Sequence, residues 1–120
     1  MDAAAFRRLG YQLVDWVADY RERLETLPVM SPARPGDIRK RFPQEPPVKG
    51  DHLQEALASL DRDLLPGITH WNHPSFFAYF PSNTSYASIL ADILASGLGV
   101  QGMSWQTSPA ATELEEAVMD

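Results

Sequence analysis

The segment of residues 66–82 constrains the fold of this chain most, because it is apolar, aromatic and uncharged. It holds two histidines and five aromatic side chains in 17 residues, with no Asp, Glu, Lys or Arg. Side chains that combine an apolar body with a polar tip gather where a protein meets a ligand or another subunit. Each of these residues alone is most simply a core residue. Together they predict a buried contact surface that the chain does not complete by itself.

Length and composition exclude several classes of protein. A chain of 120 residues forms one domain at most, with a modest core. No run approaches the roughly 18 apolar residues of a membrane span, so no membrane partner is expected. The N-terminus lacks the basic and apolar regions of a signal peptide, and the chain has no cysteine for disulfides or thiolate metal sites. These features favour a cytoplasmic protein.

The charge is distributed unevenly along the chain, whose net charge is −6. Residues 1–50 hold nine basic and seven acidic side chains, whereas residues 51–120 hold nine acidic side chains and only Arg62 as a base. Nucleic-acid binding requires a basic stripe that displaces counterions from phosphates. The only basic cluster, residues 39–41, lies among prolines without interleaved aromatics and is interpreted as a solvated or subunit-facing patch. Nucleic acid is therefore not an expected partner.

Hydrophobic periodicity predicts an all-α chain with about four helices and a proline-rich connector. The first helix, about 25 residues long, ends before Pro28, because a residue that precedes proline avoids the helical region. The connector at 28–50 holds six of the ten prolines, with one short turn expected at Gly36–Phe42. A second helix begins at Asp51 as N-cap and ends at Leu65-Pro66-Gly67.

Two more helices are predicted after the aromatic segment. Helix-starting residues at 82–85 precede an apolar pattern from Tyr86 to Leu98, which has a single charge and should be buried nearly all round. A flexible loop follows, and Ser108-Pro109 supplies the N-cap and first turn of the last helix. The chain ends at Asp120 within that helix, so we expect it to be the front part of a longer protein.

The chain alone carries no recognisable catalytic constellation. His70 and His73 are three residues apart, but Pro74 opposes a helix there and no carboxylate or thiolate joins them, so no metal site is expected. No phosphate-binding glycine loop or activated serine is present. The two lysines, Lys40 and Lys49, both lie in the connector, where neither is expected to be desolvated enough to bind a cofactor covalently.

The sequence closely resembles the N-terminal region of the aromatic-L-amino-acid decarboxylases, the group II pyridoxal-phosphate-dependent decarboxylases. The resemblance keeps its order and spacing over essentially the whole chain. The matching residues are Phe6-Arg7-Arg8, Val14-Asp15-Trp16-Val17, Pro66-Gly67-Ile68-Thr69-His70-Trp71, His73-Pro74, Phe76-Phe77-Ala78-Tyr79-Phe80-Pro81, Leu90-Ala91-Asp92, Ser108-Pro109-Ala110 and Thr112-Glu113-Leu114-Glu115.

The resemblance implies a homodimeric fold-type-I enzyme of which this chain forms the start. Residues 1–84 would be an N-terminal helical flap that contains the connector 28–50 and the substrate-lining segment 66–82. Residues 85–120 would begin the large domain. The family's cofactor-binding elements lie further along, so pyridoxal 5'-phosphate is expected in the whole enzyme, while this segment holds no catalytic residue and should be inactive alone.

The resemblance also implies particular site residues. The substrate's aromatic ring and carboxylate would be lined by a short run of residues, namely Trp71, Tyr79, Phe80, Pro81 and Ser82. Gln101 and Met103 would reach the active site of the opposite subunit. Both differ from the more apolar or aromatic residues common there in the family, which leaves the preferred ring open.

The implied activity is conversion of an aromatic L-amino acid, of tryptophan, tyrosine, DOPA or phenylalanine type, to its amine and carbon dioxide. Two alternatives stay open at this point. One is an aromatic aldehyde synthase of the same family, which shares this region. The other is a non-catalytic fragment that dimerises through the apolar faces of its first and third helices.

Overall fold

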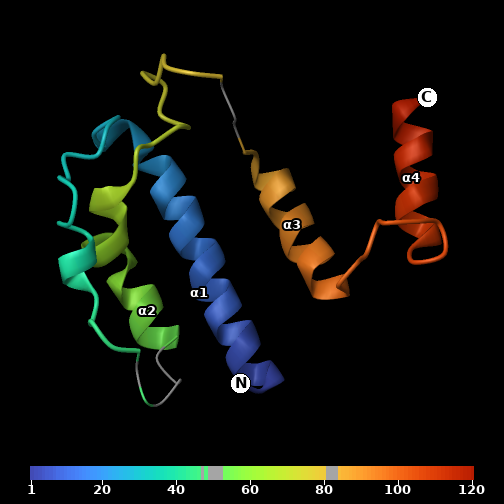
Figure 1. Cartoon of the computed structure of the whole chain (residues 1–120), viewed down its shortest axis with the longest axis horizontal. Coiled ribbons are helices and arrows are strands. Elements are labelled where there is room, and N and C mark those ends of the chain that lie inside the picture. Colours follow the sequence, from blue (N-terminus) through green and yellow to red (C-terminus); the bar gives the residue numbers. More distant parts are fainter. Residues whose placement is uncertain (47, 49–52, 81–83) are drawn as a thin grey trace. The chain divides into compact units, whose positions relative to one another are not determined.

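The computed structural model describes residues 1–46, 48, 53–80 and 84–120, and within these ranges helices are the only regular secondary structure. The all-α prediction with four main helices is therefore confirmed for the described residues (Figure 1). The chain divides into two compact units, Met1–Ser82 and Asn83–Asp120. The predicted boundary at 84 lies close to this division, while the assignment of 85–120 to a large domain stays a prediction.

Helix α1 spans Ala3–Glu22 and is shorter than the predicted 25 residues. The Asp2 carboxylate caps its start by accepting a hydrogen bond of 2.7 Å from the backbone N–H of Ala5. A 3-10 turn at Leu24–Thr26 follows, and Leu27 is extended, as a residue before proline should be. The chain thus leaves the helical conformation at Pro28 as predicted, but it tightens into the 3-10 turn first.

The connector runs from Pro28 along the first unit and contains the 3-10 turn Arg39–Arg41, which confirms the short turn predicted at Gly36–Phe42. Gly36 has a φ of +91°, a conformation that side chains with a Cβ rarely adopt. The part of the connector at 47 and 49–50 lies outside the described residues, as does the predicted N-cap Asp51.

The second predicted helix is not uniform. An α-helical part, α2, spans Leu53–Ser59, a wider π-helical turn η3 spans Leu60–Leu64, and the 3-10 turn η4 at Leu65–Gly67 ends it. At the change of pitch the Ser59 hydroxyl donates to the Ala56 carbonyl at 3.0 Å. Hydroxyl bonds of this kind compete with the helix ladder, which accounts for a local widening that hydrophobic spacing does not reveal.

Helices α1 and α2 lie side by side in the first unit (Figure 1), where Gln54 donates to Gln12 at 3.0 Å. The core of this unit is small. Its buried hydrophobic residues among those described are Leu9, Leu24 and Leu65, and the single buried polar residue is His70.

The second unit contains α3, Tyr86–Leu98, and α4, Pro109–Met119. Ser85 and Ser88 form a capping box, in which each side chain accepts a bond from the other's backbone N–H. The left-handed Gly99, with φ of +62°, ends α3, and Ser108 caps α4 with Pro109 in its first turn. Both predicted helix starts are confirmed.

The prediction that the third helix is buried nearly all round is wrong for this chain. No residue of α3 is buried, and its leucines Leu90, Leu94 and Leu98 are 57%, 62% and 68% exposed. The reason is that the second unit is too small to cover an apolar helix. Among the described residues, no helix combines the length and apolarity that a bilayer span requires.

Candidate functional site

The aromatic segment is held to the rest of the first unit by main-chain and side-chain bonds. The backbone N–H of His70 donates to the Val29 carbonyl at 2.9 Å, and the Ser31 hydroxyl donates to the Pro66 carbonyl at 2.7 Å. Within the segment, turns close through bonds from His73 to His70 and from Phe76 to His73, of 3.0 and 2.9 Å. The connector therefore anchors the start of this segment.

Three aromatic rings gather on the segment. The Trp71 ring lies 4.9 Å from that of Phe76 and stacks on that of Tyr79 at 5.7 Å with an interplanar angle of 18°. We call Trp71, Phe76 and Tyr79 the aromatic platform. Offset and tilted rings at these separations attract one another. The platform remains open, because Trp71 is 40% and Tyr79 is 85% exposed.

Tyr79 has a left-handed backbone, with φ of +57°, and it is the only non-glycine residue described with a positive φ. A bulky residue in this region is a conformational outlier that costs roughly 1–2 kcal/mol. Strain of this kind persists where the surrounding structure imposes it, and it concentrates at ligand sites. Phe80 follows this strained residue directly in sequence and is 90% exposed.

The predicted substrate-lining residues are thus partly brought together. Trp71 and Tyr79 are in contact, and Phe80 follows Tyr79 directly. Pro81 and Ser82 lie outside the described residues, so their predicted roles stay predictions. The same holds for Gln101 and Met103, whose reach into another subunit is not tested by a single chain.

Gln101 and Met103 lie in the loop between α3 and α4, which has internal order. The Thr107 hydroxyl donates to the Gln101 carbonyl at 2.8 Å, and the Trp105 indole donates to the Glu113 carboxylate at 2.8 Å. Met103 itself is 82% exposed. The loop predicted to be flexible is therefore tied to the start of α4.

The hydrogen-bond partner of His70 is the feature of the aromatic segment that the sequence did not reveal. Its side chain is 2% exposed, and its Nδ1 lies 2.8 Å from the Tyr20 hydroxyl. Burial lowers the pKa of His70, and the neighbouring His73 lowers it further. Burial raises the pKa of the Tyr20 hydroxyl, with Arg21 opposing the shift. Both side chains are consequently neutral near pH 7.

Both histidines have one ring nitrogen engaged within the chain. His70 Nδ1 is engaged by Tyr20, and His73 Nδ1 accepts the backbone N–H of Ser75 at 2.9 Å. Within the described part of the chain, no three His, Asp or Glu side chains come together in a way that could hold a metal ion.

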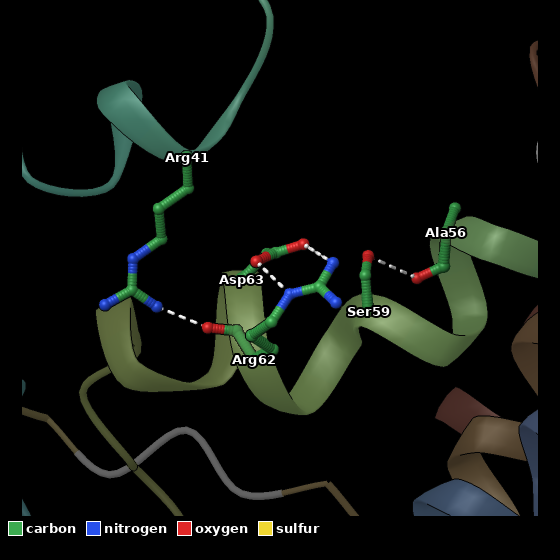
Figure 2. A network of polar contacts seen from close by, with 5 residues as sticks. All are labelled: Arg41, Ala56, Ser59, Arg62 and Asp63. Carbon is green, nitrogen blue, oxygen red and sulfur yellow. Dashed lines mark hydrogen bonds and ion pairs between the residues drawn. The ribbon is translucent and has the colours of Figure 1, made fainter.

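A second polar cluster joins the connector to the π-helical turn η3. Figure 2 shows Arg41 donating to the Arg62 carbonyl, while the Arg62 guanidinium makes two bonds to Asp63, of 2.8 and 2.7 Å. The bonds from Arg62 hold the pKa of Asp63 below its usual range. Arg41, interpreted from sequence as part of a solvated or subunit-facing patch, thus faces its own chain. Because Arg62 is largely exposed, this cluster fixes geometry more than it adds stability.

The described residues do not form a pyridoxal phosphate site by themselves. Covalent attachment of that cofactor needs a desolvated lysine. The Lys40 side chain is 78% exposed and lies 3.5 Å from the Asp37 carboxylate, and Lys49 falls outside the described residues. The described residues therefore offer an aromatic surface and no desolvated lysine.

Residues 35–120 match the pyridoxal-dependent decarboxylase conserved domain, so the chain belongs to this family. The resemblance drawn from sequence motifs is confirmed by this match.

Individual relatives are plant enzymes of aromatic amino-acid metabolism. The chain is 47% identical over its whole length to phenylacetaldehyde synthase of Arabidopsis thaliana and 42% identical to L-tyrosine/L-DOPA decarboxylase 2 of Lophophora williamsii, covering 24% and 23% of them. The crystal structure of Catharanthus roseus tryptophan decarboxylase with L-tryptophan matches all of this chain with a TM-score of 0.91 and 41% identity, over 25% of its length. The chain thus spans about a quarter of these relatives.

Proposed function

We propose that this chain is the substrate-ring portion of a pyridoxal-phosphate-dependent decarboxylase that converts an aromatic L-amino acid to its amine and carbon dioxide. The observation that carries the proposal is the aromatic platform on a strained, exposed turn, in a chain that belongs to the decarboxylase family. When bound, pyridoxal phosphate supplies the electron sink for loss of carbon dioxide.

The share of this chain in the reaction is positioning. Trp71, Tyr79 and Phe80 offer exposed apolar faces on which an aromatic side chain can stack, and a bound substrate would displace water from them. The Ser82 hydroxyl would supply a hydrogen bond to the substrate. Holding the substrate in one orientation accelerates a reaction without any covalent step by these residues.

The proposed enzyme is a homodimer in which Gln101 and Met103 complete the pocket of the other subunit. The exposed apolar surface of α3 supports this proposal, because isolated apolar patches larger than a few hundred Å² mark interaction sites. Sedimentation of the complete enzyme tests it: a monomer that retains full activity would contradict it.

An aromatic aldehyde synthase is the second candidate, because relatives of both kinds match this chain over its whole length. The relative with 47% identity is a phenylacetaldehyde synthase, while those at 42% include decarboxylases. Since both kinds of enzyme share this region of sequence, the platform serves either reaction. The products separate them, because a decarboxylase gives one amine for each carbon dioxide and a synthase gives an aldehyde.

The test is an assay of the complete enzyme that contains this chain, with tryptophan, tyrosine, DOPA and phenylalanine as substrates. We expect carbon dioxide and amine in equal amounts from at least one of them. Trp71→Ala should lower kcat/KM by about 2- to 12-fold or more, the equivalent of a ring contact of about 0.5–1.5 kcal/mol.

Tyr11→Phe is the matched control, because Tyr11 is 70% exposed on α1 and lies outside the platform. Aldehyde as the main product would favour the synthase. Failure to release carbon dioxide from any aromatic amino acid would refute both enzymes and favour a non-catalytic dimerising module.

A further inference from the structure

The most buried polar side chain described in this protein lies directly beside the platform. His70 precedes Trp71 in sequence and is 2% exposed, whereas Trp71 is 40% exposed. A buried polar group that lost its hydrogen bond would be costly, so its partner is under strong constraint. That partner is the Tyr20 hydroxyl, 50 residues away on α1 and 2.8 Å from His70 Nδ1.

Tyr20 is itself held in place by α1. Its ring stacks on that of Trp16, one helical turn earlier, at 5.6 Å and an interplanar angle of 3°. The His70 ring lies against the Tyr20 ring of this stack, with a distance of 5.6 Å between the two rings and an angle of 43° between their planes. A continuous series of ring contacts therefore leads from α1 to the residue next to Trp71.

The backbone of His70 is fixed at the same point. Its N–H donates to the Val29 carbonyl, and its own carbonyl accepts from the N–H of His73. With the backbone and the ring both held, the direction in which the chain leaves His70 is set. The position of Trp71, and of the Tyr79 ring stacked on it, therefore depends on how His70 is held.

We propose that Tyr20 and His70 are a pair of positioning residues that hold the aromatic platform at a defined orientation relative to α1. Neither touches the exposed faces offered to a ligand, so each acts through Trp71. The consequence for substrate binding rests on the proposed function, whereas the structural effect on Trp71 does not.

The structural effect can be measured in the 120-residue chain by replacing its tryptophans with 5-fluorotryptophan. Fluorine NMR with a soluble paramagnetic relaxation agent then reports solvent access at Trp16, Trp71 and Trp105 separately. Tyr20→Phe keeps the stacked ring and removes only the hydroxyl. We expect relaxation at Trp71 to rise, by at most about two and a half times given its present exposure.

Controls separate this effect from general unfolding. Relaxation at Trp105, in the other unit, should stay constant, and circular dichroism should show unchanged helix content. Tyr11→Phe should leave Trp71 unaltered. His70→Asn places an amide near the position of Nδ1 and should restore part of the wild-type behaviour that His70→Leu loses. Equal Trp71 relaxation in Tyr20→Phe and Tyr11→Phe would overturn the proposal.

Kinetics of the complete enzyme supply the second readout. Tyr20→Phe should raise KM by about threefold to tenfold with little change in kcat, the equivalent of one net hydrogen bond lost from substrate positioning. Unchanged KM with changed Trp71 relaxation would overturn the role in substrate binding. An enzyme that lacks activity in every form, with Trp71 relaxation altered as expected, would refute the proposed function and leave the positioning pair intact.

Discussion

Gly67 gives the sharpest test of how the connector packs against the aromatic segment. A Cβ at this position would lie 2.7 Å from Cγ1 and 2.8 Å from Cδ1 of Ile38. These distances are too short for carbon atoms, so Gly67→Ala must displace the Ile38 side chain. The φ of Gly67 lies outside the left-handed region, so alanine itself fits the backbone.

Two opposing effects set the size of the change. Overpacking lowers the free energy of unfolding by about 1–3 kcal/mol. Replacing glycine also restricts the unfolded chain, which raises the free energy of unfolding by about 0.4–1 kcal/mol. Gly67→Ala should therefore destabilise the first unit by about 1 kcal/mol, which lowers Tm by about 4–8 °C for a domain of this size. In an Ile38→Ala background the clash is gone, and the same substitution should stabilise by about 0.4–1 kcal/mol.

Urea unfolding followed by circular dichroism measures all four members of this double-mutant cycle. Gly10→Ala is the matched control, since nothing lies within 4 Å of its added Cβ and the position is inside α1. It should stabilise by about 0.5–1 kcal/mol in either background. An equal cost of Gly67→Ala with and without Ile38 would refute the contact.

Ser85→Ala and Ser108→Ala should each reduce helix stability by about 1 kcal/mol, measured by circular dichroism, whereas Ser96→Ala inside α3 should not. Burial in the folded state lowers the pKa of His70 from an unfolded value of about 6.5. The neutral ring therefore stabilises the fold above that pH, and this stability is lost as the pH falls below it. Thermal melts should show a Tm that decreases over this pH range, and His70→Leu should abolish the decrease. Pyridoxal phosphate added to the 120-residue chain should give no stable absorption band of a cofactor–lysine adduct. A band that disappears in Lys40→Ala would contradict this.

Local chemistry was the part of this fold most accessible from sequence. The Ser108-Pro109 start of α4 and the serine-rich start of α3 depend on neighbouring residues only, and both were predicted. The interruption of helix by Pro28 and by Pro66 is likewise a property of proline itself. The widened turn at Leu60–Leu64 was missed because hydrophobic spacing hardly distinguishes a π-helical turn from an α-helical one.

Contacts between distant residues were not accessible in the same way. The sequence presents His70 as a possible metal ligand, but no spacing rule links it to Tyr20, 50 positions away. The uncharged context of His70 did signal burial. What it could not supply was the identity of the group that satisfies a buried imidazole, since any hydroxyl, carbonyl or carboxylate could do so.

The exposed apolar face of α3 shows what a hydrophobic pattern measures. Composition predicted a helix surrounded by protein, and in this chain its leucines remain mostly exposed. Burial is a property of the complete assembly, whereas the structure describes one chain that spans about a quarter of its relatives' length. The pattern and the exposure therefore agree if another surface covers α3. The proposed second subunit and the rest of the proposed enzyme are the candidates for that surface.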